Sequence, residues 1–137
     1  MRSEVLRAED PAANSKKIVF SLEARDHGVA IVLHCQGRLI FRNEAHALAA
    51  TVSEVLPLAH RMVVDLAGVE SIDSAGLGEL VLLHMWADAA RYVLKFSGAR
   101  GSVRQALELT NLDLVLDLYA SVPEAVAAMQ HDEARTA

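Results

Sequence analysis

The sequence predicts an α/β sandwich in which about four helices pack on a mixed β-sheet of about four or five strands. Two segments near the start alternate apolar and polar side chains, which is typical of half-buried strands. Helical and strand patterns then alternate along the rest of the chain, as expected for parallel strands joined by helices. We therefore expect one sheet with an antiparallel start and a parallel later part.

The first two strands are predicted to form an antiparallel hairpin. Apolar residues alternate with polar ones from Ile18 to Leu22, and residues 26–28 (Asp-His-Gly) have the chemistry of a turn. The apolar segment 29–35 predicts the second strand. We expect Gly37 to end this strand, with residues 38–41 as a candidate short extension.

A long helix, a buried strand and a second helix are predicted next. Asn43 is a favourable N-cap for a helix whose apolar residues recur at helical spacing until Pro57 ends it. Residues 61–66 form a short apolar run that suits a strand covered on both faces. A helix over residues 75–91 is expected to follow.

The last third of the chain predicts two more strands and two more helices. Residues 91–96 suit a strand, a short helix is expected to end near Thr110, and residues 115–119 suit an edge strand. A final helix is expected over residues 122–130. Each of these helices is preceded by a capping box, a serine followed three residues later by Gln or Glu: Ser102 with Gln105, and Ser121 with Glu124.

The chain is expected to form one domain. Its 137 residues are 53% hydrophobic and 23% charged, which excludes a disordered chain and suits a single core. Residues 1–16 are aperiodic and are expected to be a flexible tail. The domain is expected to cover residues 17–130, with residues 131–137 as a C-terminal tail.

Composition also excludes several classes of partner. The formal net charge is −5, so we expect no nucleic acid, because binding a phosphate backbone requires clustered Lys and Arg. No apolar stretch approaches the roughly 20 residues needed to span a bilayer, and the start lacks the pattern of a signal peptide. We therefore expect a cytoplasmic protein that is not membrane-embedded. The only cysteine, Cys35, is expected to be a buried, inert thiol.

The usual catalytic and metal-binding patterns do not occur in the sequence. The six histidines form no HxxxH pair, and Gly76-Leu77-Gly78 is not a GxGxxG fingerprint. There is neither a GxxxxGK[ST] phosphate loop nor a GxSxG elbow. His84 falls towards the inner side of its helix, where a structural histidine is expected. We therefore expect no enzyme activity, no metal and no cofactor.

Residues 65–78 (DLAGVESIDSAGLG) run from a strand through a loop into the start of a helix, which Asp73 is placed to cap. Gly76 and Gly78 are expected to allow a close approach of the helix to the sheet. Glycines near a helix start nevertheless cost about 0.5–1 kcal/mol each relative to Ala. A helix N-terminus also favours a phosphate, so a hydroxyl placed here is a candidate phosphorylation site.

The signature DLxGVxxIDSxGLGxL, followed by SVRQALELTNLDLVLDLYASVPEA, resembles STAS domains of the anti-sigma-factor antagonist type. The resemblance covers residues 17–130 and implies a STAS-like sandwich that works by partner switching. In that family the dephosphorylated antagonist binds an anti-sigma factor with a kinase-like ATPase fold and so releases a sigma factor. Phosphorylation of a hydroxyl at the start of this helix breaks the complex.

Two departures from the family pattern bear on this switch. The resemblance places the phosphoacceptor at Ala75, which cannot carry a phosphate, and leaves Ser74 as the candidate acceptor, about 100° around the helix. The Gly-x-Leu-Asp of many members is Gly37-Arg38-Leu39-Ile40 here, without the acidic residue. The resemblance therefore implies an impaired phosphoswitch: either Ser74 replaces the acceptor, or the chain always stays competent to bind. The motif loop comprises Asp73, Ser74, Ala75, Gly76 and Gly78.

The helix after the motif also predicts a partner-binding surface. At about 100° per residue, the residues expected to cover the sheet are Gly76, Leu80, Leu83, Ala87 and Ala90. The opposite face gathers Gly78, Leu82, Met85, Trp86 and Ala89, with Ala75 at its edge. An exposed apolar stripe marks an interaction surface, unless loops cover it. We therefore take Leu82, Met85 and Trp86 as candidate partner-binding residues.

Two functions stay open on the sequence alone. The first is a module that binds an anti-sigma factor with a kinase-like ATPase fold. The second is an accessory subunit of an ABC-type lipid or solute transporter, which needs no phosphoswitch and therefore suits Ala75. In either case the apolar stripe could also pair two copies of the chain as a homodimer.

Overall fold

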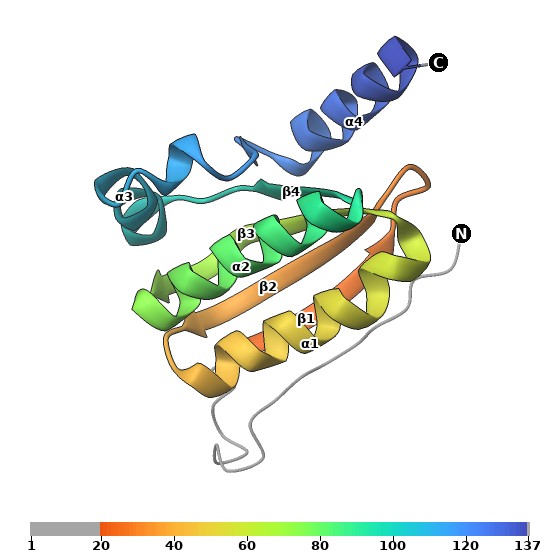
Figure 1. Ribbon diagram of the computed structural model, residues 1–137. Coiled ribbons are helices and arrows are strands. Elements are labelled where there is room, and N and C mark those ends of the chain that lie inside the picture. Colours follow the sequence, from red (N-terminus) through yellow and green to blue (C-terminus); the bar gives the residue numbers. More distant parts are fainter. Residues whose placement is uncertain (1–19, 137) are drawn as a thin grey trace.

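The computed structural model describes residues 20–136, and the side chains of residues 20–132 (Figure 1). The expected tail 1–16 and the predicted strand start at Ile18 lie outside the described residues. In chain order the elements are β1 (Phe20–Asp26), β2 (Ile31–Leu39), α1 (Arg42–Ala59), β3 (Arg61–Ile72), α2 (Ser74–Ala90), β4 (Val93–Ser97), α3 (Gly101–Leu109), the 3-10 helix η1 (Leu112–Leu114), β5 (Leu118–Tyr119) and α4 (Val122–Thr136).

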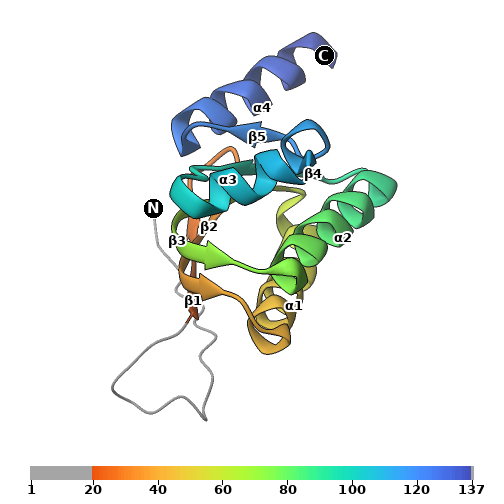
Figure 2. The same cartoon turned by 90° about the vertical axis from the view of Figure 1, so that its left-hand side faces the viewer.

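The five strands form one mixed sheet in the order β1-β2-β3-β4-β5. Strand β1 pairs with β2 in antiparallel fashion, and all later neighbours are parallel. Helices α1 and α2 lie side by side on one face of this sheet (Figure 1 and Figure 2). The predicted fold class, a mixed sheet with an antiparallel start and four α-helices, is confirmed.

The core has a large part and a small part on opposite faces of the sheet. Leu33, Met62 and Phe96 are fully buried in the part beneath α1 and α2. Because side chains alternate along a strand, the neighbouring residues point to the other face. There α4 contributes two residues to a smaller cluster: Ala30, Val32, Val63, Ala125 and Met129. Helix α4 therefore packs on part of the face that α1 and α2 leave free, over β3, β4 and β5.

Strands β2 and β3 both extend further than predicted. Gly37 does not end β2 but lies inside it with φ 106°, beside a shift in register with β3. Glycine adopts this angle without steric cost, so the strand continues to Leu39. Strand β3 extends beyond residue 66 to Ile72, because it stays paired with the end of β2.

The ends of α1 differ from the prediction. Its N-cap is Phe41, with no side-chain hydrogen bond, rather than Asn43. Pro57 does not end the helix; it lies in the last turn, and the helix continues to Ala59. Proline removes one main-chain donor there, and the left-handed His60 closes the helix by donating its N–H to the Leu56 carbonyl at 2.7 Å.

The predicted ends of the later elements are partly corrected. Ser102 does not cap α3; its hydroxyl donates to the Glu70 carbonyl at 2.9 Å, and the N-cap is Arg100. The capping by Ser121 is confirmed, since its Oγ accepts from the N–H of Glu124 at 3.3 Å. The edge strand expected over residues 115–119 shrinks to Leu118–Tyr119, because the chain turns after η1: the N–H groups of Val115 and Leu116 donate to the Leu112 carbonyl.

Helix α4 extends to Thr136, so residues 131–136, expected as part of a tail, are helical. No helix among residues 20–136 is both long enough and apolar enough to cross a membrane.

Candidate functional site

The motif lies at the edge of the sheet where the carboxyl ends of β2 and β3 meet the first turns of α1 and α2 (Figure 1). Leu39 pairs with Ile72 at the ends of the two strands, and the N–H of Asp73 donates to the Leu39 carbonyl at 3.3 Å. The two strand-to-helix connections therefore lie next to each other. In α/β proteins, sites are commonly built at this edge of the sheet.

Asp73 caps helix α2, as predicted. Its backbone is extended (φ −110°, ψ −173°), and its Oδ1 accepts from the N–H of Gly76 at 3.0 Å. The carboxylate satisfies one of the free N–H groups and places negative charge at the positive end of the helix. Ser74 follows with an exposed side chain, whereas Ala75 is half-buried. The free hydroxyl is thus one residue before the acceptor position that the resemblance implies.

The two glycines of the motif differ in what the fold requires. A Cβ atom on Gly76 would lie 2.5 Å from the Leu39 carbonyl oxygen and 2.7 Å from Cγ1 of Ile72, so α2 can approach the strand ends only with glycine there. A Cβ atom on the exposed Gly78 would meet no atom within 4 Å. The expectation that both glycines let the helix approach the sheet is confirmed for Gly76 and wrong for Gly78.

The outward face of α2 is apolar, as the helical spacing predicted. Leu82 and Met85 are 61% and 59% exposed, and Trp86 is 36% exposed with its ring centroid 5.6 Å from that of Tyr92. Most of the predicted inner face is buried, namely Gly76, Leu80, Leu83 and Ala87. Ala90, which was expected there as well, is exposed because α2 ends at this residue.

The position where the family carries an acidic residue is the half-buried Ile40. The next residue, Phe41, is 60% exposed at the start of α1. Glu44, in the first turn of α1, is buried, and its Oε2 atom has no hydrogen-bond partner within residues 20–132. The residues that follow β2 at this position are therefore aliphatic and aromatic rather than acidic. The sequence alone does not show what Phe41 and Glu44 contribute, because that depends on which strand ends meet.

A polar row crosses the other face of the sheet at one level. Asp65 is its centre: Oδ2 lies 2.8 Å from Nδ1 of His34, and Oδ1 accepts from the Ala67 N–H at 3.0 Å. This pair is not apparent from the sequence, because its members are separated by 31 positions and join only through strand register. The register aligns one residue from each strand: Glu23, His34, Asp65, Ser97 and Tyr119.

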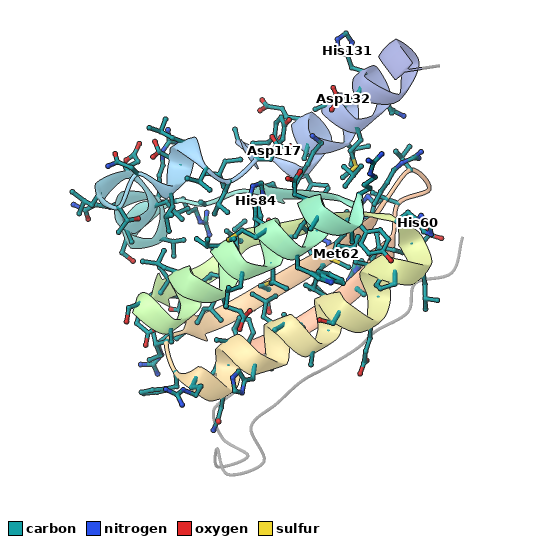
Figure 3. The ribbon with its side chains drawn as sticks, in the orientation of Figure 1. His60, Met62, His84, Asp117, His131 and Asp132 are labelled. Carbon is teal, nitrogen blue, oxygen red and sulfur yellow. The ribbon has the colours of Figure 1, made fainter. Side chains whose placement is uncertain are left out.

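Lys95 forms a buried polar centre beneath α4. Its Nζ donates to Oδ2 of Asp117 at 2.7 Å, to the Tyr119 hydroxyl at 3.1 Å and to Oδ2 of Asp132 at 3.5 Å (Figure 3 labels both aspartates). Burial lowers the pKa of Lys95, but the hydrogen bonds to Asp117 and Tyr119 outweigh it and raise the pKa overall. The pKa of Tyr119 is also raised, in this case chiefly by burial.

Cys35 is fully enclosed in the large core. Burial, with a smaller contribution from the negative charge of Asp65, raises the pKa of its thiol far above the ordinary 9.0. The thiol therefore stays protonated, which agrees with the expectation of an inert cysteine. Among residues 20–132, no group of three or more His, Cys, Asp and Glu side chains is arranged to hold a metal ion.

Solved structures show what this fold is similar to. An anti-sigma factor antagonist from Mycobacterium paratuberculosis is 22% identical, with 90% of this chain and 99% of that chain covered and a TM-score of 0.73. A candidate anti-sigma factor antagonist from Thermotoga maritima is 25% identical (80% and 94% covered, TM-score 0.72). A sulfate transporter family protein from Wolinella succinogenes is 21% identical (89% and 96% covered, TM-score 0.65).

A search of curated proteins gave no match. The family model for the STAS domain, in contrast, matches residues 21–125. This range includes all five strands except the first residue of β1, and the motif at the start of α2. The match covers well over half of the sequence, and the chain belongs to the STAS domain family.

Proposed function

We propose that this chain is a protein-interaction module that binds a kinase-type anti-sigma factor in a cytoplasmic partner-switching circuit. The observation that carries the proposal is the exposed apolar face of α2, formed by Leu82, Met85 and Trp86. This face continues from the motif at Asp73, and its Trp and Met content is favoured at interfaces. The likeness to anti-sigma factor antagonists supports this class of partner. The chain acts by binding and not by catalysis.

In this proposal the phosphoswitch is impaired. The acceptor position is Ala75, and the exposed Ser74 hydroxyl points about 100° away from it around the helix. A phosphate at position 75 would add about two negative charges next to the apolar face and so break the complex. Without that hydroxyl the face remains competent to bind. The loss of the acidic residue at Ile40 agrees with a switch that is no longer used.

Affinity capture with the full chain tests the binding surface. We expect the wild-type chain to retain an anti-sigma factor with a kinase-like ATPase domain, identified by mass spectrometry, and Trp86→Glu to lose it. Leu109→Glu is the matched control, because Leu109 is 77% exposed on α3 and lies outside the proposed surface. Equal recovery by wild type and Trp86→Glu would contradict the proposal.

Incubation with the captured kinase and ATP tests the switch. We expect the wild-type chain to keep its mass and Ala75→Ser, which restores the hydroxyl, to gain one phosphoryl group. A gain of mass by the wild type that disappears in Ser74→Ala would instead show that Ser74 has become the acceptor.

The alternative function is an accessory subunit of an ABC-type lipid or solute transporter. The likeness to a sulfate transporter family protein favours it, as does Ala75, since such a subunit needs no phosphoacceptor. The same capture experiment separates the two functions. A transporter ATPase in place of a kinase-like protein, lost again with Trp86→Glu, would support the alternative.

A further inference from the structure

We infer that the partner of α2 presents an apolar helix flanked by Lys or Arg side chains, and that the backbone of this helix passes over Gly78. The inference deepens the proposed function and rests on it. It draws on two independent observations: a glycine that the fold does not use, and the distribution of charge over the layer formed by α1 and α2.

The fold gives no reason for a glycine at position 78. Gly78 lies inside α2 with its face exposed, and a Cβ atom there would have open space around it. At Gly76, two positions earlier, the same atom would collide with the Leu39 carbonyl. A glycine within a helix weakens it relative to alanine. No contact within residues 20–132 offsets this cost at Gly78, and we assign the offset to a partner whose backbone comes closer than a side chain would allow.

The residues in line with Gly78 define the shape that a partner must match. They recur at spacings of three and four along α2, as in helix packing: Ala75, Gly78, Leu82, Met85 and Ala89. Small residues occupy the end next to Ser74 and the far end at Ala89, and the large Leu82 and Met85 lie between them. A helix fits this stripe, with its axis nearest to α2 at Gly78 and its apolar side chains against Leu82 and Met85.

The charges of α1 and α2 indicate which side chains flank the apolar face of the partner's helix. Helix α2 contains no Lys or Arg, and α1 contains only Arg42, at its first position. Glu54 of α1, and Glu79 and Asp88 of α2, form no ion pair within residues 20–132. At about 100° per residue, Glu79 and Asp88 fall on opposite sides of the apolar stripe, so free carboxylates border it. Lys or Arg on both sides of an apolar helix complement this pattern.

A second copy of this chain does not meet these requirements. Two α2 helices packed face to face would bring Glu79 and Asp88 near the same acids of the other copy, with no Lys or Arg in either helix. Like charges across an interface are repulsive, so the homodimer is not the occupant of this face.

The test uses the full chain and two synthetic amphipathic helices that share a Leu and Ala face, one flanked by Lys and the other by Glu. Trp86 is the only tryptophan of the chain and borders the stripe, so its fluorescence reports binding. We expect the Lys-flanked helix to bind, and its affinity to fall on the order of tenfold in Gly78→Ala and again in Glu79→Lys with Asp88→Lys.

Melting temperatures show whether a loss of binding is caused by a loss of folding stability. Gly78→Ala is expected to raise it by about 1–5 °C, because alanine is the better helix former and meets no obstacle. Gly76→Ala is the matched control and is expected to lower it, because its Cβ atom collides with the strand end. A gain in stability together with a loss of binding assigns the loss at Gly78 to the interface.

Unchanged affinity in Gly78→Ala, or equal binding of the two synthetic helices, would overturn the inference. Dimerisation in sedimentation experiments that Leu82→Asp abolishes would overturn it in favour of a second copy. The proposed function is tested separately, by the identity of the captured partner and by whether Trp86→Glu still captures it.

Discussion

The face of the sheet beneath α1 and α2 and the face beneath α4 are held together by different forces. The first is mainly apolar, with Met62, Leu80 and Phe96 fully buried in it, although α1 also buries Glu44 and Thr51. The second has a small apolar cluster, and beside it the buried Lys95 binds Asp117. The layer that carries the motif therefore rests on hydrophobic packing, whereas the face beneath α4 combines a small apolar cluster with a buried charged centre.

This difference suits the proposed function. An interaction surface binds more tightly when it is already formed before the partner arrives, because less conformational freedom is lost on binding. The close contact of Gly76 with the end of β2 and the burial of Leu80 and Leu83 hold α2 in place on the sheet. Leu82 and Met85 are thus presented on a rigid support.

Truncating one buried side chain on each face is expected to give the largest effects. Leu80→Ala should lower the free energy of unfolding by about 3–5 kcal/mol, since Leu80 is fully enclosed between α2 and the sheet. Met129→Ala should cost about 2 kcal/mol, because α4 can shift at its open side. Urea denaturation measures both values. Equal losses would show that the two faces are packed equally well.

Removal of the buried ammonium group comes next. Lys95→Met keeps the length of the side chain but leaves Asp117 and Tyr119 without their donor, and should cost about 1–3 kcal/mol. Arg104→Met is the control, since Arg104 is an exposed cation of α3. Urea denaturation measures both losses. Similar losses in the two variants would contradict a stabilising role of the buried ammonium group.

Alkaline pH should distinguish the two faces. The pKa values of Cys35, mainly through burial, and of Lys95, through its hydrogen bonds despite burial, are both raised in the folded chain. Each group then holds its proton more tightly when folded, so its contribution is full below the ordinary pKa and is lost as the pH rises.

Stability should therefore fall from the ordinary pKa of the thiol, 9.0, upwards, and further above the ordinary 10.5 of the lysine. Melting temperatures across this range test the order of the two losses. Cys35→Ala should remove the earlier decline and Lys95→Met should weaken the later one. The raised pKa of Tyr119 acts in the same direction as that of Lys95. A decline that neither variant alters would exclude both groups as its source.

The smallest effect is expected for Asp132, the second carboxylate bound to Lys95. Its side chain is 62% exposed and lies 3.5 Å from Nζ, so water screens the interaction. Asp132→Asn should lower the free energy of unfolding by less than about 1 kcal/mol, again by urea denaturation. A loss as large as that of Lys95→Met would mean that α4 is held chiefly through this one contact.

Local patterns were sufficient for a good part of the fold and of the motif. Asp73 was recognisable as an N-cap because a carboxylate one position before a helix bonds an N–H within the first turn. The exposed stripe on α2 followed from helical spacing alone, since Leu82 and Met85 lie on the same side of a regular helix. Both features depend on residues less than two turns apart.

Features that depend on distant segments could not be predicted in this way. Glycine is typical of a strand end, yet β2 continues beyond Gly37 because it stays paired with β3. The different roles of Gly76 and Gly78 depend on where the Leu39 carbonyl lies. Lys95 lies within a short strand that was predicted, but its burial depends on Asp117 and on Asp132 of α4, which are distant in the sequence.

The order of the strands in the sheet has a consequence for how the chain folds. Each strand lies beside the one that precedes it in the sequence, so every new strand can dock on a finished edge while the chain is being synthesised. The charges that neutralise Lys95 come from segments made after it, Asp117 and Asp132. Until they emerge from the ribosome, its ammonium group remains hydrated, and the last helix closes the fold by displacing that water.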